Sequence, residues 1–206
     1  LTVGIGHTRW ATHGKVCVAN AHPLVGEPEG DVAVVLNGIV ENYRELRTSL
    51  AEEGHVLTSE TDAECVVHLI ERHYSGDLVA AVRVAYEELE GHYAFVVVHR
   101  EHPGVLVGAR RQCPLVVGLG EGETFLSSSI AAFLSETAHI KLIEEHEIAV
   151  VKAGEVELLD ANGGVVERDV ELVDWDEDAA EKGGYETFML KEIHEQPEAV
   201  SETIGD

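Results

Sequence analysis

Short apolar runs, bounded by glycine, proline and charged residues, dominate the hydrophobic pattern of this 206-residue chain. One such run covers residues 31–36 and stops at Asn37-Gly38, a pair that is typical of turns. Runs of this length, rich in β-branched and aromatic residues, predict strands. The predicted strands are residues 3–6, 31–36, 93–99, 105–109, 115–119, 124–127, 140–143 and 147–151, followed by a hairpin over 155–167 around Asn162-Gly163.

Helical periodicity interrupts these strands in a few places. Asn42, with Glu45 three residues later, predicts a helix that begins with a capping box and ends at Gly54. Amphipathic patterns predict two more helices, one over 62–74 and one over 77–89 that begins with Asp77 as its N-cap. Shorter helical patterns cover 130–135, 186–195 and 198–204, the last two separated by Pro197.

The order of these elements favours one fold class. Most strands follow one another without a helix between them, which is typical of antiparallel sheets with helices packed outside. We therefore expect an α+β fold, and a four-layer α/β/β/α sandwich accommodates it, although periodicity alone fits other α+β folds as well. The acidic stretch after Val173 contains few strand formers, so we place a domain boundary at about residue 176.

Charge narrows the range of partners. The chain has 39 acidic and 14 basic residues, a formal net charge of −25, which repels nucleic acid and anionic membranes. The acids are scattered among well-patterned segments, so they indicate a solvated surface rather than a disordered tail. Two interpretations stay open: a protein from a salt-accumulating host, or an ordinary acidic cytoplasmic protein.

Apolar runs, cysteines and histidines lead to expectations about the cellular compartment and about metal binding. No apolar run approaches the roughly 20 residues that span a bilayer. Three cysteines without a CxxC pair argue against a disulfide framework, so we expect a reduced, cytoplasmic protein. The histidines contain no HxxxH pair, and His68 and His73 do not share a helical face well; we therefore expect no metal site and no cofactor.

Three polar clusters can carry chemistry. The first is residues 7–14, where the fork of Arg9 suits a carboxylate. In the second, the side-chain amide of Asn37 and the backbone N–H of Gly38 form a possible oxyanion hole. The third is residues 59–64, whose acids could hold an ammonium group. Each also has an ordinary interpretation: a surface loop, a simple turn and a helix cap, respectively.

The motifs that contain these clusters resemble those of one family. They are His7-Thr-Arg-Trp-Ala-Thr-His-Gly14, Asn20-Ala-His-Pro23, Leu36-Asn-Gly-Ile-Val-Glu-Asn42, Ser59-Glu-Thr-Asp62, Pro114-Leu-Val-Val-Gly118 and Lys191-Glu-Ile-His-Glu-Gln-Pro197. The whole chain resembles the glutaminase domains of glucosamine-6-phosphate synthases, which are glutamine amidotransferases with an N-terminal nucleophile. The resemblance implies an N-terminal-nucleophile hydrolase fold and the hydrolysis of glutamine to glutamate and ammonia. Residues 1–176 would form this domain, and 177–206 a linker and the start of a sugar isomerase domain.

The resemblance also implies roles for individual residues. Arg9 would bind the glutamine α-carboxylate and Asp62 the α-ammonium, while Thr12 and His13 line the same pocket. Asn37 and Gly38 would stabilise the tetrahedral oxyanion. Trp10 resembles the residue that gates the ammonia passage, although a packed core indole is an alternative interpretation.

Two departures from the family pattern matter. The family's nucleophile is a cysteine at the mature N-terminus, whereas this sequence begins with Leu1. We therefore expect a chain that lacks its first strands and has no glutaminase activity on its own, because Cys17, Cys65 and Cys113 do not match that position. Ser129 stands where the family usually has an aspartate, and we expect this change to leave the glutamine pocket untouched.

The resemblance implies partners for the longer protein. Ammonia would pass to fructose 6-phosphate on the isomerase domain, and the protein would be a homodimer. Two alternatives stay open: another amidotransferase of the same group, making phosphoribosylamine or asparagine, or a non-catalytic module that binds glutamine.

Overall fold

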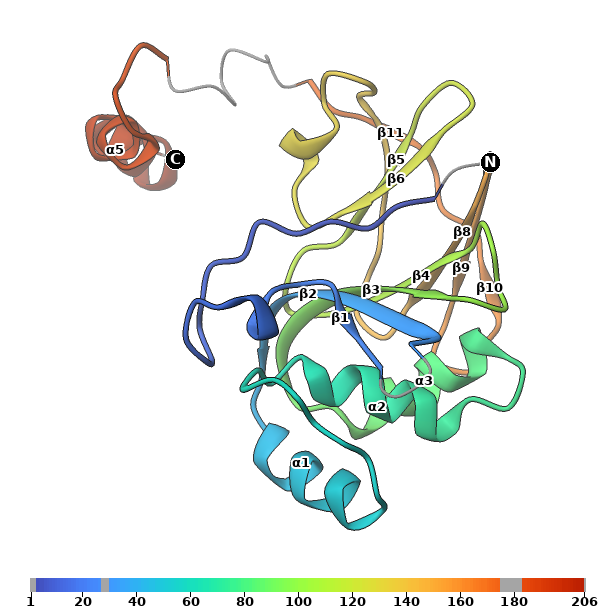
Figure 1. Cartoon of the computed structure of the whole chain (residues 1–206). Helices are drawn as coiled ribbons and strands as arrows, with labels where there is room; N and C mark the ends of the chain where they lie inside the picture. The colour runs from blue at the N-terminus through green and yellow to red at the C-terminus, as the bar shows by residue number, and fades with distance from the viewer. Residues whose placement is uncertain (1–2, 27–29, 175–182, 206) are drawn as a thin grey trace.

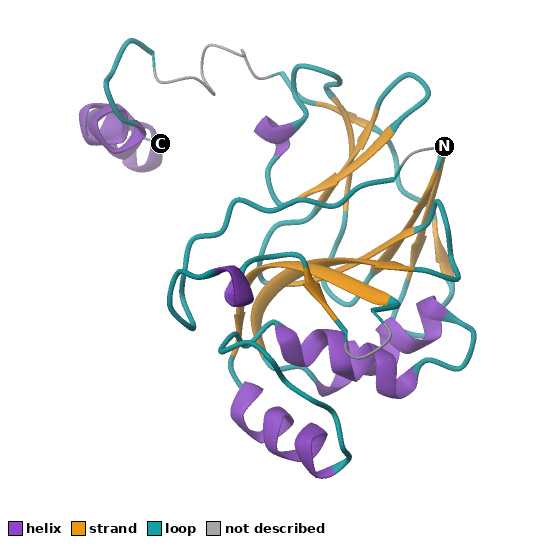
Figure 2. Cartoon of the chain, viewed as in Figure 1, coloured by secondary structure: helices purple, strands orange, loops and turns teal. Residues whose placement is uncertain are grey.

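The computed structural model describes residues 3–26, 30–174 and 183–205, and its core is two antiparallel sheets packed face to face (Figures 1 and 2). The larger sheet has the strand order β1-β2-β3-β4-β8-β9-β10, and the smaller one has the order β11-β7-β5-β6. The strands of the larger sheet are β1 (Leu24–Val25), β2 (Val32–Val40), β3 (Gly91–His99), β4 (Leu106–Arg111), β8 (Ile148–Lys152), β9 (Glu155–Leu159) and β10 (Val165–Val166). Those of the smaller sheet are β5 (Val116–Leu119), β6 (Thr124–Ser127), β7 (His139–Leu142) and β11 (Glu171–Leu172).

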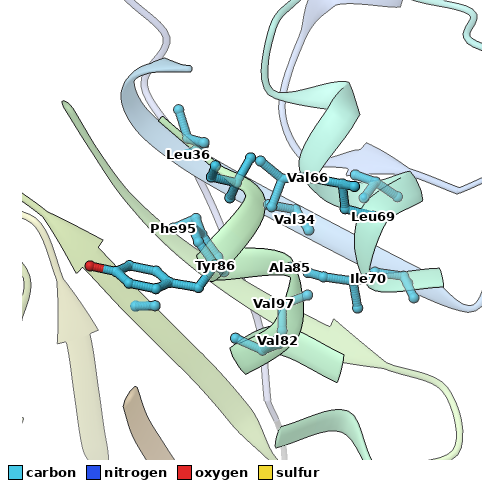
Figure 3. Close-up of a cluster of buried hydrophobic side chains, with 14 of the residues drawn as sticks. Val34, Leu36, Val66, Leu69, Ile70, Val82, Ala85, Tyr86, Phe95 and Val97 are labelled. Carbon is cyan, nitrogen blue, oxygen red and sulfur yellow. The ribbon is translucent and has the colours of Figure 1, made fainter. Parts of the chain in front are cut away.

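Two helices lie against the outer face of the larger sheet, α2 (Glu64–His73) and α3 (Leu78–Glu88), and α1 (Tyr43–Glu52) packs beside α2 (Figure 2). Alternate residues of β2 and β3, among them Val34 and Phe95, face these helices and pack on Leu69, Ile70 and Val82 (Figure 3). The cap predicted for α3 is confirmed, because the side chain of Asp77 accepts a hydrogen bond from the N–H of Ala80 at 3.0 Å.

The inner faces of the two sheets form a second core. Val35 and Val96 from the larger sheet meet Leu115 and Val117 from the smaller one, and Ile5 of the N-terminal segment packs against them. The outer face of the smaller sheet is covered, among the described residues, by the 3-10 turn η2 (Ile130–Ala132) and by Phe133. The α+β class and its antiparallel sheets are thus as predicted.

Several local predictions are wrong. Residues 3–6 form no strand, because no strand of the described chain pairs with them. Asn37-Gly38 is not a turn, since β2 continues through it to Val40 in register with β3. The predicted capping box is absent as well. The side chain of Asn42 instead donates to the carbonyl of Glu88 at 2.8 Å and accepts from the N–H of Glu90.

The C-terminal segment forms one helix, α5 (Phe188–Ile204), with Pro197 inside it, rather than two pieces. A proline removes one backbone hydrogen bond and its ring crowds the carbonyl four residues earlier, and this helix continues in spite of both effects. The expected domain boundary at residue 176 lies outside the described residues. In the described part of the chain, no helix has the length and apolar character needed to cross a lipid bilayer.

Candidate functional site

A cavity of about 630 Å³ lies where the N-terminal segment passes the ends of both sheets. Figure 1 shows this segment (dark blue) running between β2 and the smaller sheet. The cavity is lined by Gly6, His7, Thr8, Arg9, Trp10, Thr12, His13, His22, Leu36, Asn37, Gly38, Ile39, Thr61, Asp62, Ala63, Ser127, Ser128, Ser129 and Ala132. All seven residues predicted from the sequence are in this set, although they come from three separate stretches of the chain.

Asp62 is the buried acid of the cavity. Its carboxylate is only 4% exposed, and its Oδ2 accepts a hydrogen bond of 2.7 Å from the N–H of Val40 at the end of β2. The other oxygen, Oδ1, lies 3.4 Å from Nδ1 of His13. One oxygen therefore fixes the carboxylate in place, and the second faces polar groups of the cavity.

Arg9 is held by its own loop. Its guanidinium donates hydrogen bonds to the carbonyls of His13, Gly14 and Lys15 at 2.7, 3.1 and 3.2 Å. A guanidinium has five N–H donors, so two have no partner among the described residues. Both Arg9 and Asp62 contact His13, which places the cation and the acid on the same side of the molecule.

Asn37 points into the space between the sheets. Side chains alternate along a strand, and Val35, two residues earlier, belongs to the core between the sheets. The side chain of Asn37 is exposed at the cavity wall and has no hydrogen-bond partner among the described residues. Its amide is therefore available to a bound molecule.

The backbone N–H of Gly38 is directed away from β3. Residues two apart in an antiparallel strand direct their N–H and C=O groups to the same neighbour. The carbonyl of Val32 accepts from Gly26 on the β1 side, and Gly38, six residues later, has the same orientation. Because β1 pairs with β2 only as far as Val34, the Gly38 N–H has no strand partner in the described chain.

The acids of residues 59–64 have three different roles. Glu64 is 2% exposed and accepts hydrogen bonds from the backbone N–H and hydroxyl of both Thr58 and Ser59, while Arg47 donates to its Oε2 at 3.2 Å. Glu60 accepts from the side chain of Asn20 and from the N–H of Lys15. Of the three acids, only Asp62 lines the cavity.

Trp10 and Thr12 lie at the rim. Trp10 is 86% exposed, so the alternative interpretation of a packed core indole is wrong. Thr12 is also exposed. Both side chains border the opening rather than the floor of the cavity.

Several residues of the cavity wall were not predicted from the sequence. Ser127 ends β6, Ser128 and Ser129 follow it, and all three line the cavity from the smaller sheet. The expectation that a change at Ser129 leaves the pocket untouched is therefore wrong. His22 was also missed. Burial is the main cause that lowers its pKa to about 4, and the nearby charges of His7 and Arg9 lower it further. The sequence has no local pattern that places these residues opposite β2, since their position depends on how the chain packs in three dimensions.

The three cysteines are free and none lines the cavity. Cys65 is buried in α2 and its Sγ lies 3.5 Å from the carbonyl oxygen of Tyr43. Burial raises the pKa of its thiol to about 12, and burial also raises the pKa of Cys113. A thiol with a raised pKa is a poor nucleophile, which agrees with the prediction that these residues are not catalytic.

Comparison with known proteins places the cavity in a family context. A family model described as a glutamine amidotransferase domain matches residues 7–135, a range that includes every cavity residue except Gly6. Similar curated proteins carry the name glutamine–fructose-6-phosphate aminotransferase [isomerizing]. Those from Caldanaerobacter subterraneus and Streptomyces coelicolor are 48% and 50% identical over 98% of this chain, and the one from Methanothermobacter thermautotrophicus is 47% identical over 100% of this chain.

The chain spans about a third of the length of these relatives, 33%, 35% and 33% respectively. Two solved structures are similar in fold. One is described as glutamine phosphoribosylpyrophosphate amidotransferase from B. subtilis, with a TM-score of 0.64 and 22% identity over 77% of this chain and 35% of that one. The other, an allosteric regulatory enzyme of purine biosynthesis, has a TM-score of 0.65 and 23% identity over 75% of this chain and 34% of that one.

Proposed function

This chain belongs to the glutamine amidotransferase domain family, and we propose that its cavity binds glutamine and stabilises the oxyanion formed when the side-chain amide is attacked. The observation that carries the proposal is the meeting of Arg9, Asp62 and the Asn37-Gly38 pair around one cavity. A cation, a buried acid and two free N–H donors are the groups needed to hold an amino acid at one end and to stabilise an oxyanion at the other.

Each residue has a role in this proposal. The two free donors of Arg9 bind the α-carboxylate, and Oδ1 of Asp62 accepts from the α-ammonium. The amide of Asn37 and the N–H of Gly38 donate to the oxyanion. Thr12 and His13 line the site, and Trp10 lies at the rim, where it would gate the departure of ammonia.

We propose a wider role on the basis of the relatives. The name of these relatives supports a protein that transfers glutamine nitrogen to fructose 6-phosphate and yields glucosamine 6-phosphate. In this view residues 1–176 form the glutaminase domain and 177–206 lead into a sugar isomerase domain. A homodimer in the cytoplasm fits the same view, and the three free cysteines support a reduced compartment.

Binding of glutamine to the full protein tests the site directly. Asp62→Asn keeps an oxygen for the N–H of Val40 but directs an amide N–H₂ at the ammonium, so we expect affinity to fall at least about tenfold, the effect of losing one charged hydrogen bond. Glu41→Gln is the matched control, because this acid is 58% exposed and does not line the cavity. Isothermal titration gives both affinities, and equal affinity in the two variants would contradict the proposed site.

Asn37→Ala separates catalysis from binding. Removal of one oxyanion donor typically lowers kcat about 100- to 1000-fold, while glutamine affinity changes little. Glutamine hydrolysis and binding by the full protein would both be measured. If glutamine binds but neither the full protein nor the variant hydrolyses it, the alternative of a non-catalytic binding module is favoured.

A further inference from the structure

A second cluster of functional side chains lies on the helical layer, on different elements from the cavity. His55 follows α1, while His68 and Glu71 lie one turn apart on α2. One ligand atom from each of the three side chains lies within 4.8 Å of the other two. The sequence did not predict this cluster, because His55 does not lie on the helix that carries the other two residues.

The contacts in the cluster converge on one carboxylate oxygen. Oε2 of Glu71 lies 2.9 Å from Nδ1 of His68 and 4.0 Å from Nδ1 of His55. The two imidazole rings are 5.1 Å apart, centroid to centroid. Three donor atoms of the types that zinc prefers, two nitrogens and one oxygen, therefore face a common point.

The distances between the three ligand atoms are close to those in the coordination shell of a metal ion. Metal–ligand distances of about 2.0–2.1 Å in a tetrahedron place the ligand atoms about 3.4 Å apart. The His68–Glu71 distance would open slightly, and His55, whose side chain is 20% exposed, can turn inward. Glu71 is also 20% exposed, so water can reach a fourth position.

Protein hydrogen bonds do not fully satisfy the cluster. His68 is completely buried, and its Nε2 has no hydrogen-bond partner in the described chain. The acids Glu53 and Glu88 pair with Arg72 beside the cluster, so the surroundings do not carry an excess of positive charge.

Gly26 fixes the position of the carboxylate. A Cβ added at Gly26 would lie 1.5 Å from Oε1 of Glu71, so the absence of a side chain there allows the carboxylate to lie against the end of β1. The second oxygen, Oε2, is then directed at the two histidines.

We propose that His55, His68 and Glu71 bind a divalent cation of the zinc class and thereby connect the segment after α1 to α2. Bound metal would stabilise the folded chain, because the three ligands come together only in the folded state. The proposal does not depend on the function of the cavity.

Titration of the full protein with Zn²⁺ alone, and with Co²⁺ as a spectroscopic probe, tests the proposal. We expect saturable binding and a visible Co²⁺ spectrum of the intense tetrahedral type. There should be no near-ultraviolet sulfur-to-metal band, since none of the free cysteines belongs to the cluster. A spectrum with thiolate bands, or no saturable binding, would overturn the proposal.

Two variants and a control locate the site. His55→Gln removes a ligand, and Gly26→Ala displaces the carboxylate of Glu71 without changing any ligand, so both should weaken Zn²⁺ binding about 10- to 100-fold. His92→Gln is the control, because His92 pairs with Glu41 at 3.4 Å on the surface without a third ligand. Thermal unfolding without metal checks that each variant folds. Affinity equal to that of the control in both variants would show that the cluster is only a hydrogen-bonded network.

Discussion

At Gly38 the backbone has a φ of +111°, and a Cβ added there would lie 2.1 Å from the carbonyl oxygen of His92 in β3. Two separate effects therefore require glycine: a conformation that side chains disfavour, and close contact between two strands. The Asn37-Gly38 pair has the composition of a turn, yet it lies inside a strand. Composition alone does not reveal that Gly38 lies against the backbone of His92 in the neighbouring strand.

Gly38→Ala tests the second effect. We expect a loss of about 3 kcal/mol or more in the free energy of unfolding, because strain and a backbone clash act together. Gly54→Ala is the control, since Gly54 has a φ of +99° and no atom within 4 Å of the added Cβ; it should cost only about 1 kcal/mol. Denaturant unfolding measures both, and equal losses would show that the contact with β3 is unimportant.

His22 makes stability depend on pH. Its pKa is about 4 in the folded chain and near 6.5 when unfolded, so the unfolded chain binds the extra proton between these values. Stability should therefore fall as pH decreases from about 6.5 to 4, by at most about 1.4 kcal/mol per pH unit, and then level off. Unfolding of wild type and His22→Gln across this range isolates the effect, because the other histidines are common to both. Parallel pH profiles would contradict the assignment.

At the scale of elements, the turn before α2 depends on Glu64. This buried carboxylate accepts from two backbone N–H groups and two hydroxyls and is paired with Arg47, so it positions the segment that delivers Asp62 to the cavity. The helix-cap pattern in the sequence does not reveal this role of Glu64, because its hydrogen-bond donors precede the helix and Arg47 comes from α1.

Glu64→Gln should lower the free energy of unfolding by about 2–3 kcal/mol. The variant directs an amide N–H₂ at donors, so at least one buried donor loses its partner. Glu45→Gln, on the exposed face of α1, should stay within about 0.5 kcal/mol of wild type. Urea unfolding gives both values, and a neutral Glu64→Gln would show that the turn holds without the carboxylate.

Elements with a clear local signal were predicted well, and elements that depend on a neighbouring strand were not. The cap at Asp77 and the bounds of β6 follow from local sequence. In contrast, β1 and β11 have two residues each, too few for a periodicity, and exist because a longer strand lies beside them. The seven residues named from the sequence all line one cavity, whereas Ser127–Ser129 required knowledge of how the sheets pack.

At the scale of the whole molecule, the net charge of −25 opposes compaction. Added salt screens this repulsion, with a Debye length of about 30 Å at 0.01 M and about 3 Å at 1 M. We therefore expect the melting temperature to rise steadily from low to molar KCl. Calorimetry in KCl, with sucrose as an uncharged control, measures this; a flat or falling curve would contradict the interpretation of a salt-accumulating host.

The order of strands has a consequence for how the cavity forms. β4 and β8 are neighbours in the larger sheet, yet the chain between them makes the excursion that contains β5, β6 and β7. Ser127–Ser129 reach the cavity only when this excursion has folded back onto β2 and β3. A molecule bound there would contact both halves of the sandwich, so its binding requires that this excursion is folded in place.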